Sequence, residues 1–69
     1  MPYEATQLGK MQRAIGALPE PTQSIYRMHL LDGLDYGEIG AALALSTAEV
    51  ERHIAQAIVT IDRALRRRN

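Results

Sequence analysis

The same helix-start signal occurs twice in this chain, at positions eleven residues apart. In the first copy, Glu38 follows Asp35 by three positions, and in the second, Glu49 follows Ser46 by three. In such a capping box each side chain bonds to the backbone N–H of the other residue, so a helix begins just after the capping residue. The first helix must then end near Leu43 to leave room for the second start. This spacing predicts a helix of about two turns, a tight turn and a second helix, which is a helix-turn-helix.

Apolar residues support both helix starts and continue along the second helix. Leu34 and Ile39 bracket the first box, and Leu45 and Val50 bracket the second, as hydrophobic staples do. At about 100° per residue, the apolar side chains of the second helix form one stripe. They are Val50, Ile54, Ala57, Ile58, Ile61 and Leu65. We expect this stripe to face the core, with Arg52, Gln56 and Arg63 roughly opposite.

Two more helices are expected before this pair. Residues 3 to 17 have helical apolar spacing, and the prolines that follow end the segment. A further helix is predicted from about Pro21 to Asp32, with Gly33 as a left-handed stop. The residues expected to point inward are Leu8, Met11, Ile15, Leu18, Ile25 and Met28.

The composition favours an all-α fold with an aliphatic core. Phe, Trp and Cys are absent, and β-branched residues form no alternating run. We expect residues 1–69 to form one small domain: an N-terminal helix in 1–18, two helices in 19–45, and a recognition helix with a basic tail in 46–69. No apolar stretch approaches the roughly 20 residues that cross a bilayer. The N-terminus also lacks the pattern of a signal peptide, so we expect a cytoplasmic protein without membrane contact.

Charge is balanced in total and uneven along the chain. The formal net charge is zero, which by itself does not favour nucleic-acid binding. Residues 46–69 hold five basic and three acidic side chains, a net +2, and end in Arg66, Arg67 and Arg68. That run is either a solvated helix end that suits the helix dipole or a group that contacts phosphate or a partner.

No motif for catalysis or for metal binding is found in the sequence. It contains no HExxH, no GxSxG and no glycine loop that would cradle a phosphate. His53 lies four residues after Glu49, but one such pair without a third ligand is too little for a zinc site. We therefore expect no enzyme activity, no metal and no cofactor.

Four short segments together resemble a known family. They are Leu18–Pro19, "LDGLDYGEI" from Leu31 to Ile39, Leu45–Ser46, and "VERHIAQAI" from Val50 to Ile58. In this order and spacing, over about residues 15 to 65, the chain resembles region 4 of sigma-70 family transcription initiation factors. It is most similar to the extracytoplasmic-function group, in particular its iron-citrate-type branch.

The resemblance implies a fold, a target and partners. Region 4 in those factors recognises the promoter −35 element through its recognition helix. It also docks on the flap of the RNA polymerase β subunit, and anti-sigma factors often cover it. Nothing in this chain corresponds to region 2, which melts and reads the −10 element, so whether the sequence is a whole protein or part of a longer factor stays open.

The chain departs from the family pattern at four positions outside the polar face. Ala44 lies in the turn where glycine is usual, and Gly40 lies where a small alanine is usual. A left-handed alanine costs on the order of 1 kcal/mol, and Gly40 should weaken the short helix. Gln23 stands where the family is commonly basic, and Leu30 stands where a polar residue is usual.

The DNA-binding interpretation assigns six side chains to the duplex: Thr47, Ala48, Arg52, His53, Gln56 and Arg63. Arg52 can bond to a guanine edge or pair with Glu49 or Gln56, and Gln56 can read adenine or be an ordinary surface residue. Thr47 and Ala48 are candidates for a phosphate or a thymine methyl. Glu49 is better explained by its capping role than as a cytosine reader.

Acidic residues limit how tightly such a helix can bind DNA. Glu49, Glu51 and the uncharged Gln56 stand where the family often has Arg or Lys, so they reduce the positive charge of the recognition helix. We expect about three to five neutralised phosphates and modest binding by the domain alone.

The alternative interpretation is a sigma-like module that binds protein. Its partner would be an anti-sigma factor, the RNA polymerase flap or a second copy in a homodimer, with little DNA binding. Leu30, Ala55 and Val59 are the candidate residues for this surface. Single exposed apolar residues are common on proteins, so these positions suggest a surface and do not establish one.

Overall fold

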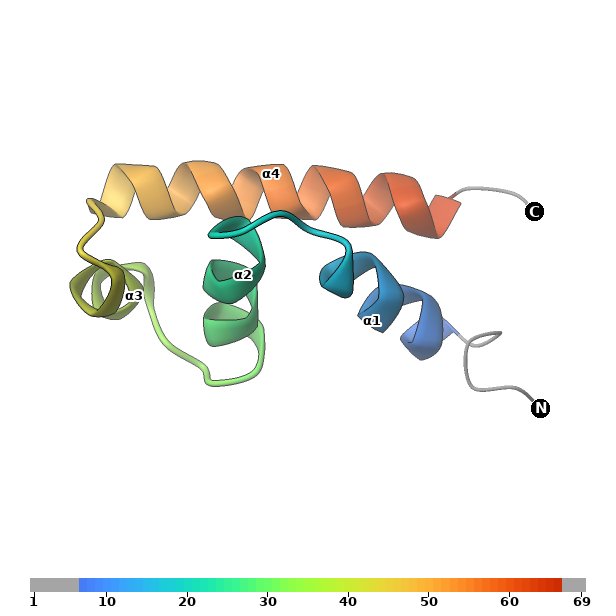
Figure 1. The fold of residues 1–69 in the computed structure, drawn as a ribbon, viewed down its shortest axis with the longest axis horizontal. Helices are drawn as coiled ribbons and strands as arrows, with labels where there is room; N and C mark the ends of the chain where they lie inside the picture. The colour runs from blue at the N-terminus through green and yellow to red at the C-terminus, as the bar shows by residue number, and fades with distance from the viewer. Residues whose placement is uncertain (1–6, 67–69) are drawn as a thin grey trace.

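The computed structural model describes residues 7–66, which form four helices. In chain order these are α1 (Gln7–Gly16), α2 (Thr22–Leu30), α3 (Tyr36–Leu43) and α4 (Thr47–Arg66). α4 is the longest, and the other three pack along one side of it (Figure 1). The predicted all-α class with a helix-turn-helix is confirmed. Residues 3–6 of the first predicted helix, and Arg67 and Arg68 of the basic tail, lie outside the described residues.

The ends of α2 differ slightly from the prediction. This helix stops at Leu30, two residues before the predicted end at Asp32. Gly33 adopts the predicted left-handed conformation, with φ of 70°. The N–H of Leu34 then donates to the carbonyl of Met28 at 3.2 Å. The chain thereby turns between α2 and α3.

Polar side chains close the corner between α1 and α2. The Gln23 amide donates to the carbonyls of Gly16 and Leu18, at 3.1 and 3.0 Å. At the start of α2, one carboxylate oxygen of Glu20 accepts from the N–H and the hydroxyl of Ser24. Gln23, which replaces a commonly basic residue of the family pattern, therefore satisfies carbonyls at the end of α1.

The core is aliphatic and centres on the inner stripe of α4. Val50, Ile54, Ala57 and Ile61 are buried there, at the spacing of one helix face. The other buried apolar residues are Ala14, Ile15 and Leu18 in and after α1, Ile25 and Tyr26 in α2, and Ile39 in α3. Each helix thus contributes at least one buried side chain, and the domain depends on all four.

Two predicted core residues are exposed instead. Ile58 has 53% of its surface exposed, because it lies at the edge of the α4 stripe and the other helices cover only one side of α4. Leu8, in the first turn of α1, is 57% exposed. Leu65 and Met11 are half-buried and pack against the core. Helical periodicity correctly predicts the buried residues at the centre of the α4 stripe, but it also predicts burial at the edge of the stripe, where Ile58 is exposed.

Both capping boxes are formed. The N–H of Glu38 donates to Asp35 Oδ1 and the N–H of Asp35 donates to Glu38 Oε1, each at 2.8 Å. At α4, the N–H of Ser46 donates to Glu49 Oε1 at 2.8 Å, and the N–H of Glu49 donates to Ser46 Oγ at 3.1 Å. The starts of α3 and α4 are therefore fixed by reciprocal bonds between near neighbours.

The turn between α3 and α4 explains the exchanged glycine and alanine. Ala44 adopts the left-handed conformation, with φ of 59° and ψ of 43°. The N–H of Leu45 donates to the carbonyl of Gly40 at 2.9 Å. A Cβ atom on Gly40 would lie 2.6 Å from the carbonyl oxygen of Leu45. Gly40, expected to weaken α3, is thus the residue that allows the turn to approach so closely.

Candidate nucleic-acid interface

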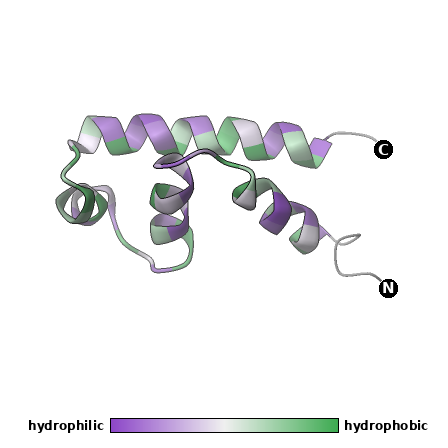
Figure 2. Ribbon diagram, in the orientation of Figure 1, coloured by the Kyte–Doolittle hydropathy of each residue, from purple (hydrophilic) through white to green (hydrophobic). Residues whose placement is uncertain are grey.

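The N-terminal half of α4 presents a polar surface on its uncovered side. Thr47, Ala48, Arg52 and Gln56 are exposed there, and Arg63 is exposed two turns further on. Hydrophilic and hydrophobic segments alternate along α4, as expected for a helix with one buried side (Figure 2). The helix is about 30 Å long at 1.5 Å per residue, enough to lie along the major groove of a duplex.

Glu49 places a negative charge at the start of this surface. Hydrogen bonds from the backbone and the side chain of Ser46 lower the pKa of Glu49, and the charges of Arg52 and His53 lower it further. The carboxylate is therefore ionised at neutral pH and bound to the first turn of its own helix. Its capping role agrees with the geometry, and it also offsets part of the positive charge of Arg52.

His53 is the one DNA-binding candidate that is partly covered. Its ring Nδ1 lies 2.8 Å from Oγ1 of Thr22, the first residue of α2. Thr22 is 3% exposed, and His53 is half-buried. No local sequence pattern predicts this contact, because the two residues are 31 positions apart.

The arginines at the end of α4 differ in their surroundings. Arg66 Nε lies 3.2 Å from Asp62 Oδ2, one turn earlier, and both side chains are largely exposed. Over residues 7–66, Arg63 forms no ion pair of this kind. Of the two, Arg63 is therefore better placed to meet a phosphate.

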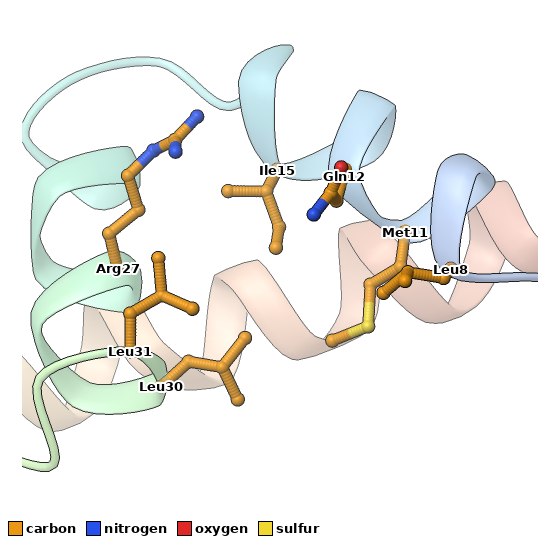
Figure 3. A pocket seen from close by; sticks show the side chains of 7 residues that line it. All are labelled: Leu8, Met11, Gln12, Ile15, Arg27, Leu30 and Leu31. Carbon is orange, nitrogen blue, oxygen red and sulfur yellow. The ribbon is translucent and has the colours of Figure 1, made fainter. Parts of the chain in front are cut away.

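A second surface lies away from α4, in a groove between α1 and α2. Leu30 and Leu31 at the end of α2 face Leu8, Met11 and Ile15 of α1 across it (Figure 3). The groove has a volume of about 390 Å³, and Gln12 and Arg27 complete its lining. Leu31 is 67% exposed and Leu30 is 43% exposed. The adjacent leucines at the end of α2 are the sequence signal for this groove, and of the two only Leu30 is predicted from the sequence as a partner residue.

The groove has one charged residue in its lining, Arg27, and it contains only one of the three candidate partner residues. The helices that form it contain Lys10, Arg13 and Arg27, and neither contains an acidic residue. Leu30 lines the groove, whereas Ala55 and Val59 are exposed on α4, which contributes no residue to the lining. The three residues therefore do not share this groove.

Two further features are absent from residues 7–66. No group of three His, Asp or Glu side chains in this range is placed to hold a metal ion. Within the same residues, no helix is long and apolar enough to span a bilayer.

The geometry defines the class of domain. A capped short helix, a tight turn and a long helix with an uncovered polar side form a helix-turn-helix, in which the second helix is the one that meets DNA. The family profile described as Sigma-70, region 4 matches residues 8–67. The protein therefore belongs to the sigma-70 region 4 family.

Family membership gives the coarse function. Sigma-70 region 4 domains are transcription domains that bind DNA and contact RNA polymerase, and they are not an enzyme family. Comparison with curated proteins gave no match, and comparison with solved structures gave none. The resemblance seen in the sequence is confirmed at the level of region 4, and the iron-citrate-type subgroup stays a prediction.

Proposed function

We propose that α4 enters the major groove and reads an element like the promoter −35 element. The observation that carries this proposal is the joint exposure of Thr47, Ala48, Arg52 and Gln56 on the first turns of a helix. The capping box of Ser46 fixes where those turns begin. Residues near the N-terminus of a recognition helix are the ones that reach base edges in this class of domain. We also propose that the domain comes from the iron-citrate-type group.

Each exposed side chain has a distinct role in this proposal. Arg52 bonds to the O6 and N7 atoms of a guanine, and Gln56 bonds to an adenine. Arg63 neutralises a phosphate, while α3 lies across the backbone. Thr47 and Ala48 meet a phosphate or a thymine methyl at the helix start. Contacts to bases set the preferred sequence, and contacts to phosphates set most of the affinity.

The test is a comparison of two arginine variants on a duplex selected for tight binding. Arg52→Ala should weaken binding to that duplex about 5- to 150-fold, the effect of losing one bidentate base contact worth about 1–3 kcal/mol. Arg13→Ala removes the same charge from the exposed side of α1 and should change binding less than twofold. Equal losses in the two variants would leave charge alone as the cause and contradict base reading by Arg52.

The second candidate is recognition of a protein partner, and the α1–α2 groove favours it. An apolar groove with one basic lining residue, Arg27, fits an amphipathic segment that carries an acidic residue at its edge. The RNA polymerase flap, an anti-sigma factor or a second copy of the domain could supply that segment. DNA binding by α4 and partner binding by the groove use different surfaces, so both can hold together.

Serine variants distinguish the surfaces. Leu30→Ser should weaken binding to the isolated flap domain of RNA polymerase at least tenfold if the groove is the docking site. Leu43→Ser changes a comparably exposed leucine on α3 and serves as the control. Val59→Ser should have no effect in that case. If Val59→Ser is the variant that loses binding, α4 rather than the groove holds the partner.

A further inference from the structure

Thr22 and His53 form a polar link between the start of α2 and α4. The distance from Thr22 Oγ1 to His53 Nδ1 is 2.8 Å. Thr22 is the buried polar residue in a core whose other buried side chains are apolar. A buried hydroxyl left without a partner is costly, so the contact is a strong restraint on the imidazole ring. The ring orientation of His53 is therefore set by α2 as well as by its own helix.

The restraint leaves one ring nitrogen available to a ligand. Within residues 7–66, Nδ1 of His53 forms its hydrogen bond to Thr22, and Nε2 forms none. The two nitrogens of an imidazole point in roughly opposite directions. With Nδ1 directed at a buried residue, Nε2 is directed away from it. His53 directly follows Arg52 and precedes Gln56 by three positions, so it borders the side of α4 that carries both.

We propose that Thr22 positions His53 as a phosphate ligand, and that DNA binding by α4 is coupled to protonation of this histidine. The inference rests on the proposed function of α4. In the imidazolium form both nitrogens are donors. Nδ1–H then donates to Thr22 Oγ1, while Nε2–H donates to a phosphate oxygen in a charge-assisted bond. In the neutral form the Thr22 hydroxyl donates to Nδ1, and the ring brings no charge to the interface.

Several charged side chains lie near the imidazole ring of His53. Glu49, one turn earlier on α4, interacts electrostatically with His53. Arg52 directly precedes His53 on the same helix. The other titratable side chains on the helices packed against α4 are Lys10 and Arg13 on α1, Tyr26, Arg27 and His29 on α2, and Tyr36 and Glu38 on α3, while Glu20 lies just before α2. Glu20 and Glu38 are each bonded within their own helix starts, and His29 bonds to the carbonyl of Leu34.

The experiment measures affinity for a labelled duplex at about pH 6 and pH 8, which bracket the titration of an imidazole. The domain should bind about 3- to 10-fold more tightly at the lower pH, with a salt dependence steeper by about 0.9 in slope, as expected for one more neutralised phosphate. His53→Gln should remove both effects. His29→Gln changes the other histidine and should retain them.

Variants of Thr22 test the positioning step. Thr22→Val keeps the branched shape and removes the hydroxyl, and it should lose most of the pH effect. Thr22→Ser restores the hydroxyl and should recover it. Circular dichroism checks the fold, and His53→Gln carries the test if Thr22→Val does not fold.

Three outcomes would contradict the proposal in different ways. A pH effect that survives in His53→Gln would overturn the role of His53. An effect that survives in folded Thr22→Val would overturn the role of Thr22. Binding with no pH dependence would overturn the proton coupling and leave DNA recognition by α4 intact, whereas no binding at either pH would contradict both.

Discussion

The two ends of the domain are built by different means. At the α3–α4 junction, two capping boxes and a close turn fix the start of α4 through hydrogen bonds between residues no more than five apart. At the α1–α2 pair, apolar side chains line an open groove, and Leu8, Leu30 and Leu31 stay substantially exposed.

The difference indicates two kinds of surface. Base recognition needs side chains held in one register, because a hydrogen bond to a base edge tolerates little displacement. A rigid helix start provides that register. Apolar docking of a helix needs area and shape rather than a fixed register of donors. The junction is therefore suited to DNA, and the groove is suited to a protein segment.

The largest expected effect comes from replacing a glycine with alanine. The same change can be made at the α3–α4 junction and at the end of α1, and the two results can be compared. Gly40→Ala places a Cβ atom 2.6 Å from the Leu45 carbonyl oxygen, so the turn must shift. We expect it to lower the free energy of unfolding by about 1–3 kcal/mol, even though alanine is the better helix former. Gly16→Ala meets nothing within 4 Å and should be neutral or stabilising. Urea unfolding of both variants measures the difference. Equal stability of the two variants would show that the close approach of the turn does not require glycine at position 40.

The next effect is the loss of the cap on α4. Ser46→Ala removes the acceptor of the Glu49 N–H and should cost about 1 kcal/mol. Ser46→Asp retains a capping side chain and should keep most of that stability. Thermal unfolding compares the two. If Ser46→Ala unfolds at the same temperature as the parent domain, the capping box does not fix the start of α4.

A stabilising change is expected at the turn itself. Ala44→Gly relieves the left-handed alanine, and we expect a gain of about 0.5–1 kcal/mol after the added chain entropy of glycine. Ala42, inside α3, gives the matched control, since Ala42→Gly should destabilise by about 1 kcal/mol. Losses of stability in both variants would show that Ala44 is not strained in solution.

The smallest effect is the pH dependence at Glu49. The pKa of this group lies below its ordinary value of 4.5 in the folded domain, so its contribution is present above that value. The contribution is lost as the pH falls through the lower, folded pKa. The stability difference between the parent and Glu49→Gln should therefore shrink below about pH 4. A difference that stays constant from neutral to acid pH would contradict the cap as its source.

Local chemistry made much of this structure predictable. The capping boxes gave the starts of α3 and α4 because each depends on residues three positions apart. The left-handed glycine after α2 followed from the same kind of short-range rule, whereas the left-handed Ala44 before α4 followed from the resemblance to the family, which usually has glycine there. The central stripe of α4 followed from helical periodicity, which is also a local property.

Contacts between distant segments set what could not be predicted. Ile58 and Leu8 have the spacing of core residues, but their exposure depends on how far the neighbouring helices extend over them. Gly40 is expected from the sequence to weaken α3, but the path of the turn places the Leu45 carbonyl oxygen where a Cβ atom on residue 40 would clash with it. The bond between Thr22 and His53 joins residues 31 positions apart, and no pattern in the sequence marks it.

The central claim is that α4 binds duplex DNA, and titration of the domain with a labelled random duplex at about 50 and 200 mM salt tests it most directly. With about three to five neutralised phosphates, affinity should fall about 40- to 500-fold over that range, at a slope of about −0.9 per phosphate. Such a result would justify selecting the preferred site. A folded, helical domain that shows no binding at the lower salt would contradict the claim and leave the groove between α1 and α2 as the functional surface.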